Sequence, residues 1–279
     1  MENKIGIIGG SGIYEIDGGD ILKEHKVETP FGPPSDLIFE VEIEGVTCFF
    51  LPRHGRNHHL LPSEINSCAN IFALKKLGVR YLVSVSAVGS LKEKIYPRNF
   101  VIPHQFIDWT KGLRRKTFFG EGLVGHVSNS IPVDIKLSQI VGQCCEKLNI
   151  THHFGGAYIC IEGPQFSSVA ESNIYRNLGA DVVGMTNLPE AYLAKEAGLQ
   201  YTTLGMVTDF DAWREKTPFD IIIENMRHNT LVAKKLIVSL IKEINDNPPP
   251  VQKENLTSIL TSPTFWSKKH KEILEILLR

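Results

Sequence analysis

Short apolar runs alternate with helical patterns along most of the chain. Runs rich in β-branched and aromatic residues predict strands at 4–8, 37–41, 46–51, 81–85, 100–103, 157–161, 181–183 and 201–207. Helical spacing predicts helices at 63–77, 134–148, 169–178, 189–197 and 220–244. In the first of these helices, Ile65, Ala69, Phe72, Ala73 and Leu77 recur at helical intervals.

This order of elements predicts an α/β fold with a central sheet flanked by helices. Glu44-Gly45 separates two adjacent strands and indicates a hairpin, so we expect the sheet to be mixed. We predict one domain over residues 1–247. Pro248-Pro249-Pro250 ends the last long helix, and residues 248–279 form a tail with a helical apolar stripe from Phe265 to Leu277.

Composition limits the classes of function. The chain has 279 residues, 42% hydrophobic and 22% charged, with a net charge of −1. Nucleic-acid-binding domains usually show a basic excess, so we expect no nucleic-acid partner. The start of the chain lacks a signal-peptide pattern, and no apolar stretch has the length of a membrane span. The five cysteines have no CxxC spacing, so we expect reduced thiols, a cytoplasmic protein and no structural zinc.

The first candidate motif is Gly6-Ile7-Ile8-Gly9-Gly10-Ser11-Gly12, directly after a predicted strand. Backbone N–H groups that converge in a glycine-rich loop bind anions, and the Ser11 hydroxyl adds a donor. A plain tight turn remains an alternative. A dinucleotide fingerprint is disfavoured, because Glu15 stands where its third glycine would be.

The second motif, Pro52-Arg53-His54-Gly55-Arg56-Asn57-His58-His59, also follows a strand. The guanidinium fork of Arg53 matches phosphate oxygens, so Arg53 and His54 predict an anion site. The i, i+4 spacing of His54 and His58 would suit zinc on a helix, but Gly55 disfavours a helix there. A surface loop is the alternative, especially for His59.

Three further motifs follow predicted strands. Val83–Ser90 ends a strand in small residues, where a ligand can approach the backbone. In Glu162-Gly163-Pro164-Gln165-Phe166-Ser167-Ser168, Phe166 could stack on a flat base or belong to the core. In Thr208-Asp209-Phe210-Asp211, the two carboxylates could form the floor of a pocket or cap a helix.

Taken together and in this order, the motifs resemble the methylthioadenosine phosphorylase branch of the purine nucleoside phosphorylase family. The resemblance covers about residues 4–245 and includes IGIIGGSG, ETPFGPPSD, PRHGRNH, SAVGSL, QFIDWT, IEGPQFSS, GMTNLPE and TDFDAW. It implies a single α/β domain that assembles as a homotrimer or a dimer of trimers. It also implies phosphorolysis of 5′-methylthioadenosine to adenine and 5-methylthioribose 1-phosphate, with inorganic phosphate as co-substrate and no metal or other cofactor.

The resemblance assigns roles to individual residues. Phosphate is expected to contact Ser11, Arg53, His54, Ser86, Ala87 and Thr186. The adenine is expected to contact Phe166, Ser167, Asp209 and Asp211, of which the two aspartates are also the catalytic candidates. Met185, His58 and His126 are expected near the ribose and its 5′-substituent, with His126 reaching a neighbouring subunit.

The chain departs from this family in a few places. Ser67 and Cys68 stand where relatives usually have Tyr and a longer polar residue, Gln165 replaces a usual Arg, and Gly184 replaces the Asn of animal members. A purine nucleoside phosphorylase acting on adenosine, inosine or guanosine is the nearest alternative function. A catalytically inactive nucleoside-binding protein is the alternative from another class.

Overall fold

The computed structural model describes residues 4–10, 19–215, 217–251 and 258–279. Its strands are β1 (Lys4–Gly9), β2 (Gly19–His25), β3 (Ile38–Ile43), β4 (Val46–Pro52), β5 (Val79–Ser90), β6 (Phe100–Ile102), β7 (Gln105–Trp109), β8 (His152–Phe154), β9 (Ala157–Ile161), β10 (Val182–Gly184) and β11 (Gln200–Phe210). Its helices are α1 (Ser67–Lys76), α2 (Ile135–Lys147), α3 (Val169–Asn177), α4 (Asn187–Glu196), α5 (Phe219–Asp246) and α6 (Lys268–Leu277), with a 3₁₀ turn η2 (Pro263–Phe265).

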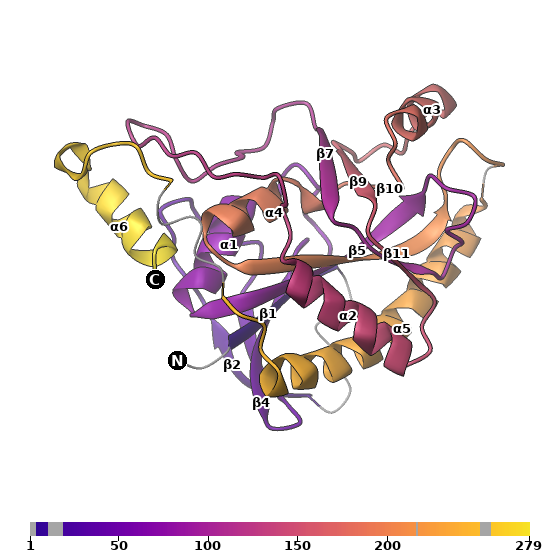
Figure 1. Cartoon of the computed structure of the whole chain (residues 1–279), viewed down its shortest axis with the longest axis horizontal. Helices are drawn as coiled ribbons and strands as arrows, with labels where there is room; N and C mark the ends of the chain where they lie inside the picture. Colours follow the sequence, from indigo (N-terminus) through magenta and orange to yellow (C-terminus); the bar gives the residue numbers. More distant parts are fainter. Residues whose placement is uncertain (1–3, 11–18, 216, 252–257) are drawn as a thin grey trace.

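The strands form one mixed sheet, as the sequence predicts (Figure 1). The main path runs β2-β3-β4-β1-β5-β10-β9-β7, and β11 pairs with β5 and β6, while β8 pairs with β6. Strands β4, β1, β5 and β11 are mutually parallel, whereas β10 runs antiparallel to β5. The predicted hairpin between β3 and β4 is confirmed, and Glu44 and Gly45 both have positive φ, as a type I′ turn requires.

Helices cover both faces of the sheet. Because successive strand residues point to opposite faces, Ile7 of β1 packs toward α2 and α5, whereas Ile8 packs toward α1 and α4. Long apolar side chains such as Leu236 and Ile237 of α5 are fully buried. No helix within the described ranges combines the length and apolar character needed to cross a bilayer.

The C-terminal tail packs on the same core as the rest of the chain. Ile273, Ile276 and Leu277 of α6 belong to the apolar cluster that also contains α1. Leu274 packs with Phe119 and Leu123 of the loop before α2. The division into a domain and a tail at residue 247 stays a prediction.

Most predicted elements are present with shifted ends, and three strands were not predicted. The first helix begins at Ser67 rather than at residue 63, because the Asn66 side chain accepts the Ala69 N–H and caps it there. Strands β2, β7 and β8 lack a long apolar run. Strand β2 is an exposed edge strand with charges along it, which hides the strand signal.

Candidate active site

Several residues expected to bind phosphate or base lie along the second half of β5 and on its two neighbouring strands. Gly89 pairs with Val183 of β10 on one side and with Asp209 of β11 on the other. Because β10 runs back along β5, the chain that follows it returns toward Ser86, whose hydroxyl donates to Asn187 Oδ1 at 2.9 Å. Ser86 and Gly89 are three residues apart on one strand, about 10 Å.

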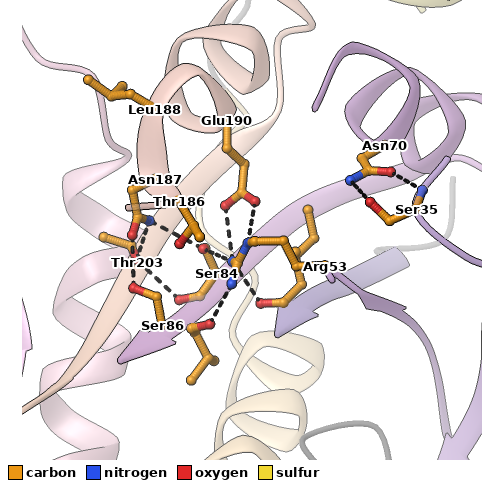
Figure 2. Close-up of polar contacts among 12 residues, drawn as sticks. Ser35, Arg53, Asn70, Ser84, Ser86, Thr186, Asn187, Leu188, Glu190 and Thr203 are labelled. Atoms are coloured by element: carbon orange, nitrogen blue, oxygen red, sulfur yellow. Dashed lines mark hydrogen bonds and ion pairs between the residues drawn. The ribbon is translucent and has the colours of Figure 1, made fainter. Parts of the chain in front are cut away.

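Arg53 lies beneath this edge in a buried ion pair (Figure 2). Its Nε donates to Glu190 Oε2 at 2.9 Å, and Nη2 donates to Ser84 Oγ at 2.6 Å. The backbone oxygens of Val85 and Ile8 accept from Nη1 and Nη2. Burial opposes the charge of Arg53, but the charge and hydrogen bond of Glu190 outweigh it and raise the arginine pKa.

Asn187 links this ion pair to Ser86. Its Nδ2 donates to Tyr201 Oη and to Thr203 Oγ1, both at 2.7 Å, and Tyr201 Oη donates to Glu190 Oε1 at 3.0 Å. The Asn187 side chain is fully buried, so its amide must be satisfied internally. The orientation of Ser86 is therefore set through Asn187 by groups from β11 and α4.

Thr186 lies beside this network at the start of α4 (Figure 2). Its hydroxyl oxygen is buried and has no hydrogen-bond partner within the part of the chain that the structure describes. The Thr186 N–H donates weakly to Tyr158 Oη, at 3.4 Å. A buried hydroxyl without a partner suits an oxygen of a bound anion.

His54 is buried at the end of β4 and is held in one tautomer. Its Nδ1 lies 2.9 Å from the Leu60 carbonyl oxygen, which only accepts, so Nδ1 carries the proton. Burial, partly offset by this hydrogen bond, lowers the pKa of His54 to about 4, so the ring is neutral at pH 7 with Nε2 as an acceptor. The exposed His58 ring stacks on it with centroids 4.4 Å apart.

Ala87 and Ser11 are the remaining predicted phosphate ligands. Ala87 is exposed on β5, one residue after Ser86. Ser11 lies outside the described residues. Over the described ranges, no three His, Cys, Asp or Glu side chains gather so as to hold a metal ion.

Asp209 and Asp211 flank Gly89 at the end of β11. A Cβ placed on Gly89 would lie 3.4 Å from Asp211 Cβ and 3.8 Å from Asp209 Oδ2. The register of β11 shifts between Val207 and Asp209, a bulge that redirects the following side chain. The two predicted base-binding carboxylates are therefore neighbours across one glycine, and neither caps a helix.

The two carboxylates have different surroundings. Burial raises the pKa of Asp209 to about 6, and the charge of Asp211 adds to this effect, although Thr208 Oγ1 donates to Asp209 Oδ1 at 2.7 Å. Asp211 is 7% exposed, and its Oδ2 has no hydrogen-bond partner among the residues described. One carboxyl can thus carry a proton near pH 6, while the other offers an acceptor.

The loop after β9 exposes Phe166 and buries part of Ser167. Phe166 is 72% exposed, so it is not a core residue of the single chain. Ser167 Oγ is buried and lacks a hydrogen-bond partner in the described part of the structure. Gln165, one of the departures from the family pattern, is exposed.

Met185 lies against the loop after β9, whereas His126 lies elsewhere. A Cβ on Gly163 would come 2.5 Å from Met185 Sδ, which shows how closely the two loops approach. His126 is exposed in the loop between β7 and α2, and its N–H donates to Ser258 O at 2.9 Å. That loop runs beside α6, away from α3 (Figure 1).

Sequence reasoning missed residues that hold the predicted ones. In the sequence, Asn187 and Glu190 stand out only within the GMTNLPE motif and the predicted helix at 189–197, and Asn225 and Asn229 only as positions in the predicted helix at 220–244. Asn225 Nδ2 donates to Thr208 O and Asn229 Nδ2 to Val207 O, each at 2.8 Å, on either side of the bulge. The i, i+4 spacing of two asparagines on an apolar helical face was the signal available for them.

Comparison with known proteins adds to this geometry. The family model described as the phosphorylase superfamily matches residues 4–242. S-methyl-5′-thioadenosine phosphorylase of Geobacter sulfurreducens is 44% identical over 282 residues, covering 100% of this chain and 99% of its own. The same-named protein of Rhodospirillum rubrum is 48% identical over 250 residues, covering 88% and 85%.

Two solved structures are similar over most of their length. One is a methylthioadenosine phosphorylase from an Antarctic soil metagenomic library, with a TM-score of 0.95, 44% identity and coverage of 100% of this chain and 99% of its own. The other is a point mutant of the Schistosoma mansoni adenosine/methylthioadenosine phosphorylase in complex with methylthioadenosine. It has a TM-score of 0.82, 35% identity and coverage of 87% and 92%.

The buried ion pair yields a stability prediction. Replacing Arg53 with Met leaves Glu190 buried without its cation, which should lower the free energy of unfolding by about 3–5 kcal/mol. In Arg53→Met/Glu190→Leu, both charges are absent, so much of this loss should be recovered. Urea unfolding followed by circular dichroism measures both effects.

A surface pair supplies the control. Arg279→Met removes an exposed ion pair with Glu275 and should leave unfolding nearly unchanged. If Arg53→Met unfolded at the same urea concentration as the original protein, the buried pair would not stabilise the fold as expected.

Proposed function

The chain belongs to the phosphorylase superfamily, and from this premise we infer that it splits 5′-methylthioadenosine with inorganic phosphate. The products are adenine and 5-methylthioribose 1-phosphate. Adenine can enter purine salvage, and the methylthioribose phosphate can enter methionine salvage. The observation that carries this proposal is the Asp209–Asp211 pair at the end of β11, in a chain that aligns over its whole length with proteins of that name.

Phosphate is proposed to bind between Ser86 and Ala87 of β5 and Thr186 at the start of α4. Thr186 and Ser86 supply hydroxyls, and His54 Nε2 accepts the proton of a protonated phosphate. Arg53, whose charge is paired with Glu190, orients Ser84 from beneath. The direct contacts of Arg53 and of Ser11 with phosphate stay predictions from the resemblance.

The base is proposed to bind between the loop after β9 and the end of β11. Phe166 stacks on the adenine, and the unpartnered Ser167 hydroxyl bonds to it. Asp211 Oδ2 accepts from the 6-amino group, and protonated Asp209 donates to N7. Because Asp211 presents an acceptor to the 6-position of the base, it favours 6-aminopurines, which donate there, over 6-oxopurines, whose O6 is itself an acceptor.

Catalysis then follows from charge development. The C1′–N9 bond breaks with its electron pair moving to the purine, and the proton of Asp209 neutralises the charge at N7. Phosphate oxygen attacks C1′ from the opposite face and forms the C1′–O bond. We propose that phosphate is a co-substrate and that no cofactor takes part, since holding two reactants in place can by itself supply much of an enzyme's acceleration.

The ribose and 5′-substituent are proposed to lie between these two sites. Met185 packs under the sugar, and His58 and His126 approach the 5′-substituent. The loop that carries His126 runs beside α6 and away from α3 (Figure 1), which supports its reaching the site of a neighbouring subunit. The five cysteines are free and buried, which supports a reducing compartment such as the cytoplasm.

Turnover should depend strictly on phosphate. Adenine release from 5′-methylthioadenosine, followed with and without phosphate, should occur only with it, and faster than base release from inosine. Asp209→Asn should lower the rate by about 10²–10⁴-fold, because it removes a general acid. Undiminished adenine release in phosphate-free buffer would contradict phosphorolysis.

The pH dependence of kcat/KM should show the titration of Asp209. Its protonated form is the active acid and its pKa is about 6, so kcat/KM for 5′-methylthioadenosine should fall as pH rises through that value. His54, with a pKa of about 4, should add no limb between pH 5 and 8. A descending limb that survived in Asp209→Asn would assign the titration to another group.

We also propose a homotrimer or a dimer of trimers. Exposed apolar side chains gather on β7, α3 and the nearby loops: Trp109, Leu113, Phe166, Val169, Ile174 and Leu178. Light scattering should give three or six times the chain mass of 31.2 kDa. The double variant Ile174→Glu/Leu178→Glu should dissociate the assembly. The control Ile21→Glu, on the exposed strand β2, should not. An original protein that is monomeric would refute the proposal.

A further inference from the structure

Two loops of the proposed site approach each other closely. The loop after β9 carries Phe166 and Ser167, and the loop after β10 carries Met185 and Thr186. The strands β9 and β10 are paired in parallel, so both loops leave the sheet at the same end. A residue that fixes the position of one loop relative to the other therefore affects both the base-binding and the phosphate-binding part of the proposed site.

Arg114 joins these two loops. It lies in the segment between β7 and α2 and is 8% exposed. Its Nη1 donates to the carbonyl oxygens of Met185 and Leu188, both at 2.7 Å. Its Nη2 donates to the carbonyl oxygen of Glu162 at 2.7 Å. One guanidinium thus spans the carbonyls that precede Phe166 and those that flank Thr186.

Glu162 completes the junction. Arg114 Nε donates to Glu162 Oε1 at 3.1 Å, the Lys111 N–H donates to Oε2 at 2.5 Å, and the Ser63 hydroxyl donates to Oε1. Burial acts to raise the pKa of Glu162, but these hydrogen bonds and the charge of Arg114 outweigh it and hold the pKa below its ordinary value. The carboxylate therefore fixes the plane of the guanidinium.

The geometry requires arginine rather than a cation alone. The donors of Arg114 fan out in one plane to two separate stretches of backbone. A lysine ammonium is a compact charge on a flexible stem and cannot reach both stretches in fixed directions. Met185 Sδ against Gly163 leaves little room for the loops to shift once the guanidinium is in place.

We propose that Arg114 is a positioning residue that holds the base-binding loop against the loop of Met185 and Thr186. A single side chain then sets the geometry of both substrates. The proposal rests on the proposed function, because it takes the base from the first loop and the sugar and phosphate from the second.

The test is Arg114→Lys, with Arg115→Lys as its matched control. Arg115 is the next residue and exposed, and its Nε donates to Thr117 O within its own segment. Arg114→Lys should raise the KM for 5′-methylthioadenosine and the KM for phosphate together and lower kcat, with kcat/KM falling about 10–100-fold. Arg115→Lys should stay within about twofold of the original protein, since it moves neither loop.

Thermal unfolding separates positioning from stability. Both KM values should rise at temperatures where circular dichroism shows Arg114→Lys fully folded. If Arg114→Lys does not fold, Glu162→Gln provides the test. Its amide oxygen can still accept from Arg114 Nε, but the negative charge is lost. Glu162→Gln should therefore raise both KM values by a smaller factor than Arg114→Lys. A folded variant with unchanged KM values, or one whose loss equals its unfolded fraction, overturns the proposal.

The two proposals can fail separately. If the original protein released no adenine with phosphate, the proposed function would be wrong. Arg114 would then be tested by calorimetric binding of adenine and of phosphate, and unchanged affinities in Arg114→Lys would overturn its role. If the original protein is active and Arg114→Lys equals it, only the positioning role is wrong.

Discussion

The site depends on the buried pair between Arg53 and Glu190. Arg53 directly follows β4 and Glu190 lies in α4, far apart in the chain, and each needs the other because a lone buried charge is strongly destabilising. Their remaining hydrogen bonds go to Ser84, Tyr201 and the backbone oxygens of Ile8 and Val85. The pair therefore holds the polar edge of the sheet together, where apolar packing cannot.

The carboxylates at the other end of the site depend on packing rather than on pairing. Asp209 and Asp211 meet across Gly89, where the absence of a side chain leaves room for both. Desolvation, which raises the pKa of Asp209 to about 6, comes from the surrounding fold and not from the residue. Two asparagines of α5 hold the bulged backbone that aims them. The same fold thus supplies a donor and an acceptor from two identical side chains.

Buried strands and regular helices could be predicted from periodicity because they are apolar over a whole run. Strand β9 and the regular part of α4, after the non-helical Leu188, begin where the pattern placed them. Strand β2 could not be found this way, since its exposed edge carries charges. Strand β8 is only three residues long. The start of α1 was misplaced because Ser63, which looks like a cap, instead bonds to Glu162.

The sequence alone determined which motifs lie at the strand ends and which family they resemble, because those motifs are local and keep their order. Only the tertiary structure decided that Arg53 pairs with Glu190, that Asp209 and Asp211 differ, and that Arg114 joins two loops. These features depend on contacts between distant residues and on burial. Local residue spacing predicts neither the contacts nor the burial, because both arise only when the sheet brings its strand ends together.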